Sequence, residues 1–120
     1  MKLCIPADRP ALDANVDARF GRATYLVVVD SDTGSLIESV ENHPNMQAAA
    51  GAGIQAGQAA VETGADALLC RHCGPKAFRV LTAGGMKVYL GASGTVADAV
   101  EAFCKGRLSE AEAANVEGHW

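Results

Sequence analysis

The chain has 120 residues, of which 49% are hydrophobic and 20% charged, and its formal net charge is −4 at pH 7. This length suits one domain with a hydrophobic core of its own. The acidic balance, the lack of a basic run and the few aromatic residues exclude a typical nucleic-acid-binding surface. No apolar run approaches the ~20 residues that span a bilayer. We therefore expect no membrane segment and a cytoplasmic protein, in which the four cysteines are reduced thiols.

The first half of the chain predicts three strands. Residues 2–5 form an apolar first strand that ends at Pro6. Residues 7–23 form a polar loop, and a loop of this length in a compact domain is more often functional than idle. Residues 24–30 are rich in β-branched residues, and a short turn joins them to a more alternating strand over residues 35–42. These last two strands predict an antiparallel hairpin.

The second half predicts helices that alternate with strands. Helices are expected over residues 53–63, 75–83 and 96–105, and strands over residues 65–69 and 86–90. Because strand–helix–strand units join parallel strands, the prediction is an α/β domain with a mixed five-stranded sheet and helices on its faces. Residues 1–106 would form this domain, and residues 107–120 a C-terminal tail or short helix.

We expect a ligand-binding site at one edge of the predicted sheet, because ligands of such sheets bind beyond the carboxyl ends of the parallel strands. The turns over residues 70–75 and 91–95 should meet there. The first of them holds two cysteines, a histidine and an arginine, and it leads into a helix N-terminus. Thiols and imidazole suit soft metals, and a helix N-terminus suits anions. A single C-x-x-C pair is nevertheless a weak zinc signal, so plain half-buried thiols are an open alternative.

Five segments, in order along the chain, resemble a known family: residues 1–6, 16–23, 51–56, 74–78 and 91–96. With them the chain resembles the dinitrogenase iron–molybdenum cofactor biosynthesis family. The resemblance implies a ribonuclease H-like fold with the order β-β-β-α-β-α-β-α. It also implies binding of metal–sulfur clusters or their precursors rather than catalysis.

The short length favours the stand-alone branch of the family, similar to the orange protein of sulfate reducers. The resemblance then implies a molybdenum–copper sulfide cluster or an iron–molybdenum–sulfur cluster as cargo. This inorganic cluster would be the main partner, and a recipient protein is a further candidate partner.

This hypothesis predicts two kinds of site residue. Cations and backbone N–H groups would hold an anionic cluster, and the candidates are Arg19, Arg22, Arg71, Gly74, Lys76, Gly91, Ser93, Gly94 and Thr95. Candidate metal ligands are Cys70, Cys73, His72, His43 and Met46. In this family the segment before Gly74 need not contain cysteine, so the resemblance itself gives Cys70 and Cys73 no role.

An alternative from another class is a cytosolic dithiol oxidoreductase that uses Cys70 and Cys73. Redox dithiols sit at strand–helix junctions, where the helix N-terminus lowers the pKa of a thiol. Against this reading, the predicted helix begins after Cys73, and the order of elements differs from that of thioredoxin. A nuclease of ribonuclease H type would need inward carboxylates for two metal ions, and the first strand offers none.

Overall fold

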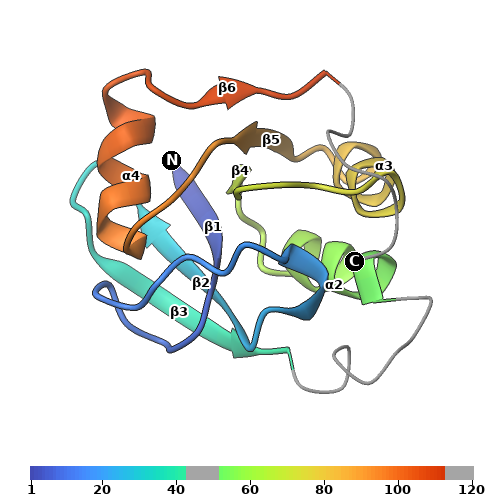
Figure 1. Cartoon of the computed structure of the whole chain (residues 1–120), viewed down its shortest axis with the longest axis horizontal. Coiled ribbons are helices and arrows are strands. Elements are labelled where there is room, and N and C mark those ends of the chain that lie inside the picture. The colour runs from blue at the N-terminus through green and yellow to red at the C-terminus, as the bar shows by residue number, and fades with distance from the viewer. Residues whose placement is uncertain (43–51, 113–120) are drawn as a thin grey trace.

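The structure is a computed structural model that describes residues 1–42 and 52–112. Within these residues the strands form one mixed sheet in the order β3-β2-β1-β4-β5-β6 (Figure 1). The strands are β1 (Lys2–Ala7), β2 (Tyr25–Asp30), β3 (Leu36–Glu41), β4 (Ala67–Leu69), β5 (Lys87–Leu90) and β6 (Ser109–Glu110). The predicted hairpin of β2 and β3 and the parallel pair β4–β5 are confirmed. The unit β3–α2–β4 does not place its two strands side by side, because β4 pairs in parallel with β1 instead.

Helices cover both faces of the sheet. They are the α-helices α2 (Ala52–Glu62), α3 (Pro75–Ala83) and α4 (Val96–Cys104), with a short 3-10 helix η1 (Phe20–Arg22) in the first long loop. Side chains alternate along β1, since Leu3 and Ile5 pack under α4 whereas Cys4 points to the side of α2 and α3. The strand β1 therefore belongs to two hydrophobic cores, one on each face.

The prediction that Pro6 ends the first strand is wrong, because β1 continues to Ala7. Pro6 still lies opposite Leu26 of β2, whereas the pairing of β1 with β4 stops at Cys4. The missing N–H of the proline thus falls beyond the last residue that pairs with β4. Its carbonyl accepts a hydrogen bond from the amide of Asp17 at 2.9 Å.

The predicted count of five strands is also wrong, since a sixth strand forms within the segment expected to be a tail or short helix. Ser109 and Glu110 pair with Leu90 and Tyr89 of β5, and the amide of Ala111 donates to Val88 at 2.7 Å. This polar segment has no strand pattern of its own. It is held in place because β5 offers an otherwise unpaired edge. The mixed α/β class is confirmed, and the ribonuclease H-like description stays a prediction.

In the part of the chain that the structure describes, no helix has the length and apolar character needed to cross a membrane.

Candidate functional site

The two predicted turns do meet at the carboxyl edge of the parallel strands. The amide of Ala92 donates to the carbonyl of Cys70 at 3.1 Å, so the turns after β4 and β5 lie side by side. The first long loop crosses the same edge, where the amide of Val16 donates to the carbonyl of Gly94 at 2.9 Å. Three loops, from the first, fourth and fifth strands, therefore converge as the sequence predicted.

The N-terminus of α4 is closed by the protein itself. The amides of Val96 and Ala97 donate to the carbonyls of Ala14 and Leu12, at 2.9 and 3.0 Å. A capping box is present: the amide of Asp98 donates to Thr95 Oγ1 (3.1 Å), and the amide of Thr95 donates to Asp98 Oδ2 (3.0 Å). The expectation that Thr95 and the start of this helix supply N–H groups to a ligand is thus corrected, because these groups already have partners.

Gly94 also has a structural task in this turn. Its φ is +76°, and a Cβ there would lie 2.6 Å from Asp98 Oδ2. A side chain would therefore displace the carboxylate that completes the capping box. Gly91 and Ser93, in the exposed first part of the turn, stay candidates for contact with a ligand.

The N-terminus of α3, in contrast, is open. Gly74 has no side chain to cap it, and Pro75 at the first position has no N–H. The first hydrogen bond of the helix runs from the amide of Phe78 to the carbonyl of Gly74 at 3.0 Å. Among the described residues, no partner is found for the amides of Lys76 and Ala77. These two N–H groups and the partial positive charge of the helix end are therefore available to an anion.

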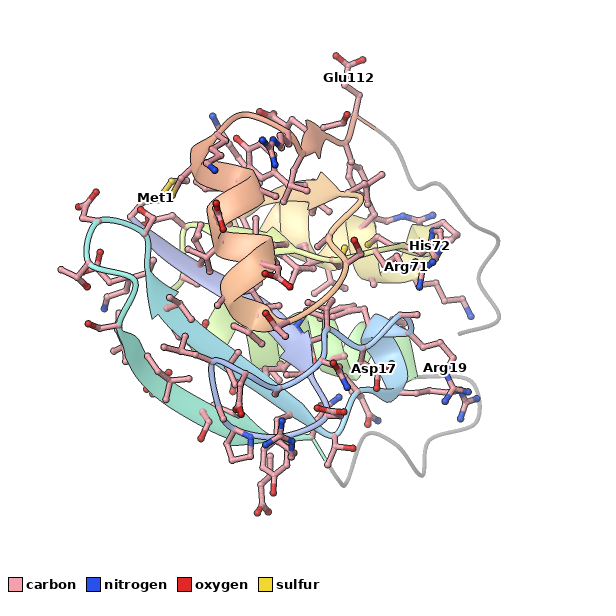
Figure 2. The ribbon with its side chains drawn as sticks, turned by 60° about the vertical axis from the view of Figure 1, so that its left-hand side comes forward. Met1, Asp17, Arg19, Arg71, His72 and Glu112 are labelled. Carbon is pink, nitrogen blue, oxygen red and sulfur yellow. The ribbon has the colours of Figure 1, made fainter. Side chains whose placement is uncertain are left out.

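Basic residues flank this helix end in the sequence. Arg71 and Lys76 are exposed, one on each side of Gly74 and Pro75. Arg19 points to the same side of the molecule as Arg71 and His72 (Figure 2). None of the ion pairs within residues 1–42 and 52–112 uses these basic residues.

Arg22 lies half-buried in η1, and both η1 and α3 contact α2. One acidic group lies among the cations: the Asp17 carboxylate accepts a hydrogen bond from the amide of Arg19 at 2.9 Å.

Cys70 and Cys73 lie in one buried cluster just below this edge, and their exposed fractions are 0% and 1%. The Cys73 thiol donates a hydrogen bond to the carbonyl of Gly74 at 3.6 Å. The hydrogen bond from Cys70 to the sulfur of Cys73 raises the pKa of Cys70 well above its ordinary value, and burial acts in the same direction. The same bond lowers the pKa of Cys73. Cys73 therefore loses its proton before Cys70 does.

A third thiol lies on the same face of the sheet. Cys4 belongs to the same buried cluster as Cys70 and Cys73, and burial raises its pKa to about 12. Cys104 is exposed and lies elsewhere, with its sulfur 3.6 Å from the carbonyl oxygen of Ser31. The sequence alone does not predict whether Cys4 lies near the other two thiols, because the face of the sheet that its side chain occupies depends on the register of β1 against β4.

Comparison with known proteins identifies the family. Residues 1–106 match the family described as dinitrogenase iron-molybdenum cofactor. The chain belongs to this family.

Solved structures of similar proteins extend over almost the whole chain. The apo form of the orange protein from Desulfovibrio gigas is 40% identical, with 96% of each chain covered and a TM-score of 0.90. A candidate NifB protein from Thermotoga, of the DUF35 family, is 37% identical over 98% of each chain, with a TM-score of 0.80. A relative found by sequence comparison, an uncharacterised protein from Methanocaldococcus jannaschii, is 25% identical over 93% of this chain and 92% of its own.

The metal ligands predicted for this member of the dinitrogenase iron-molybdenum cofactor family stay a prediction, and the structure shows where some of them lie. Cys70 and Cys73 lie close together. His72, which stands between them in the sequence, is half-buried. In the described ranges, however, no group of three or more His, Cys, Asp or Glu side chains comes together around a possible metal position. A closed four-ligand zinc site is therefore not formed by these residues. His43 and Met46 lie outside the described residues.

Proposed function

We propose that this chain binds and carries an anionic, molybdenum-containing metal–sulfur cluster, or a precursor of one, and turns nothing over. The cluster would be of the molybdenum–copper sulfide or the iron–molybdenum–sulfur type. Membership of the dinitrogenase iron-molybdenum cofactor family and 40% identity to the orange protein support this role. Both point to a cofactor-related protein rather than to an enzyme.

The observation that carries the proposal is the contrast between two helix ends at one edge. The start of α4 has partners for its first amides, whereas at the start of α3 the amides of Lys76 and Ala77 have none among the residues that the structure describes. A thiomolybdate-type cluster is a multiply charged anion with sulfur atoms on its outside. Free N–H groups, a helix end that carries about half a positive charge, and nearby cations are the groups that stabilise such an anion.

The proposed binding surface combines these groups. Arg71 and Lys76 would contact the cluster from the turn and the first turn of α3, and Gly74 would let it approach the backbone closely. Arg19 and Arg22 would add charge from the loop that crosses the edge. The buried thiols below this surface are not needed to hold an anion there.

A dithiol oxidoreductase is the second candidate, because the hydrogen bond between Cys70 and Cys73 and the lowered pKa of Cys73 suit a redox pair. Burial disfavours this candidate. The attacking thiol of a disulfide reductase must reach a sulfur atom of its substrate, whereas Cys70 and Cys73 are 0% and 1% exposed. A protein disulfide could not approach them without opening of the edge.

The experiment that tests the proposal is an ultraviolet–visible spectrum with elemental analysis. The protein is purified without oxygen and offered tetrathiomolybdate, alone and with Cu(I), and unbound reagent is removed by gel filtration. We expect intense visible charge-transfer bands and about one cluster per chain. A colourless protein without molybdenum that reduces small disulfides would overturn the proposal in favour of the dithiol enzyme.

A further inference from the structure

We propose that Cys70 and Cys73 form a two-coordinate binding site for a single Cu(I) ion, bound between their two sulfur atoms. This site goes beyond the proposed function, because it would bind copper without any molybdenum or sulfide present. It lies beneath the anion-binding surface rather than on it.

The fold itself brings the two sulfur atoms together. Cys70 directly follows β4, where its amide donates to the carbonyl of Tyr89 at 3.0 Å, and this bond fixes the position of its backbone. Cys73 directly precedes Gly74, the N-cap residue of α3. Both side chains belong to the same buried cluster, and the Cys73 thiol also lies 3.6 Å from the carbonyl oxygen of Gly74. Because a strand end and a helix start hold them, the thiols are positioned before any ion arrives.

The surroundings of the pair suit a soft ion of low charge. The thiols lie in a hydrophobic cluster with Phe20, Leu26 and Leu68. Arg71, between them in sequence, is nevertheless exposed, so the pair lies only one layer below the surface. A small ion could enter from the edge, and a hydrated divalent ion would lose its water shell in this environment at a large cost.

The number and the type of the available ligands favour Cu(I) over other metal ions. Zinc and iron–sulfur centres in proteins take about four ligands, and calcium and magnesium need oxygen ligands. Within the described part of the chain, no third His, Cys, Asp or Glu joins a group that could hold a metal ion. Thiolates select soft metals such as Cu(I), and a closed-shell Cu(I) ion is satisfied by two thiolates on opposite sides.

The binding step balances without a change of oxidation state. Two Cu–S bonds form, the two S–H bonds break, and two protons pass to the solvent. The product is a bis-thiolate complex with one negative charge. The N-terminus of α3 begins directly after Cys73 and Gly74, and its partial positive charge favours that charge.

The test is an anaerobic titration in which the protein competes for Cu(I) with a chromophoric chelator, with no molybdenum present. We expect one tightly bound copper per chain. Cys70→Ser and Cys73→Ser should each weaken binding at least about 100-fold, because a single thiolate remains. Cys104→Ser removes an exposed thiol elsewhere and should bind copper as the unchanged chain does. Equal binding by all three variants, or no binding by the unchanged chain, would overturn the proposal.

A second measurement needs no variant, in case a serine at a buried position prevents folding. X-ray absorption at the copper edge of the loaded protein should show two sulfur neighbours. Nitrogen neighbours, or three or four ligands, would contradict a two-coordinate site. The cluster proposal can fail separately: a folded Cys70→Ser/Cys73→Ser double variant should lose Cu(I) and still bind tetrathiomolybdate.

Discussion

The amide of Val96 donates a hydrogen bond to the carbonyl of Ala14 at 2.9 Å, across 82 positions of the sequence. This bond closes the N-terminus of α4 with the first long loop and so decides which helix end at the edge stays open. The two strand-to-helix turns before α3 and α4 therefore have different tasks. The turn before α4 is structural, and the turn before α3 leads into two amides, those of Lys76 and Ala77, for which residues 1–42 and 52–112 supply no partner.

Thr95→Ala should destabilise the fold without weakening cluster binding. The substitution removes the hydroxyl that accepts from the amide of Asp98, and loss of such a cap costs about 1 kcal/mol. Urea denaturation measures this change. Thr82→Ala is the matched control, since the Thr82 hydroxyl bonds only carbonyls of its own helix, Phe78 at 2.9 Å and Arg79 at 3.3 Å. An equal loss of stability in both variants would contradict the assigned cap.

The contribution of Asp98 to stability should depend on pH. Hydrogen bonds from the backbone and side chain of Thr95 lower the pKa of Asp98. A carboxylate whose pKa is lower in the folded state stabilises the fold above its unfolded pKa, and this contribution is lost as the pH falls through the folded pKa. Asp98→Asn should thus be less stable than the unchanged chain at pH 7, and the difference should shrink in acid. A difference that stays constant down to the acid range would argue against this capping role.

Gly94→Ala should destabilise the fold more than Gly34→Ala does. Both glycines have a positive φ, +76° and +74°, so an alanine at either costs roughly 1–2 kcal/mol of backbone strain. At Gly34 a Cβ would meet nothing within 4 Å, whereas at Gly94 it would lie 2.6 Å from Asp98 Oδ2. Thermal or urea unfolding of the two variants isolates the effect of this contact. Equal destabilisation would show that the capping carboxylate moves aside freely.

The four thiols should react at very different rates. Cys104 is exposed, whereas Cys4, Cys70 and Cys73 are buried. In the native protein we expect one thiol to react quickly with a chromogenic disulfide reagent, and all four to react after denaturation. Cys104→Ser should abolish the fast phase. A fast phase of two or more thiols would mean that Cys70 and Cys73 are accessible, as the oxidoreductase alternative requires.

Local patterns in the sequence predicted most of the elements and the edge at which they meet. The β-branched run in β2, the turn before α3 and the capping box of α4 are signals carried by neighbouring residues. The strand β6 was missed because Ser109 and Glu110 form a strand only by pairing with β5. Long-range contacts of this kind leave no pattern in the segment itself.

In the candidate site, too, local sequence patterns predicted some features, and the others depend on long-range contacts. The sequence predicted that the turns before α3 and α4 would both offer N–H groups, since each contains glycine and joins a strand to a helix. The bonds from Val96 and Ala97 to the first loop could not be foreseen, because they depend on where that loop crosses the edge. The position of Cys4 beside the thiol pair likewise depends on strand register.

The central claim is that free amides and cations at the start of α3 hold an anionic cluster, and an equilibrium titration with tetrathiomolybdate and Cu(I) tests it most directly. The Arg71→Gln/Lys76→Gln double variant is compared with Lys87→Gln/Arg107→Gln, which removes the same charge from exposed positions at the start of β5 and after α4. We expect the first variant to bind at least about 10-fold more weakly, a difference of about 1.4 kcal/mol, and the second to bind nearly as the unchanged chain does. Equal affinity of the two double variants would contradict the account.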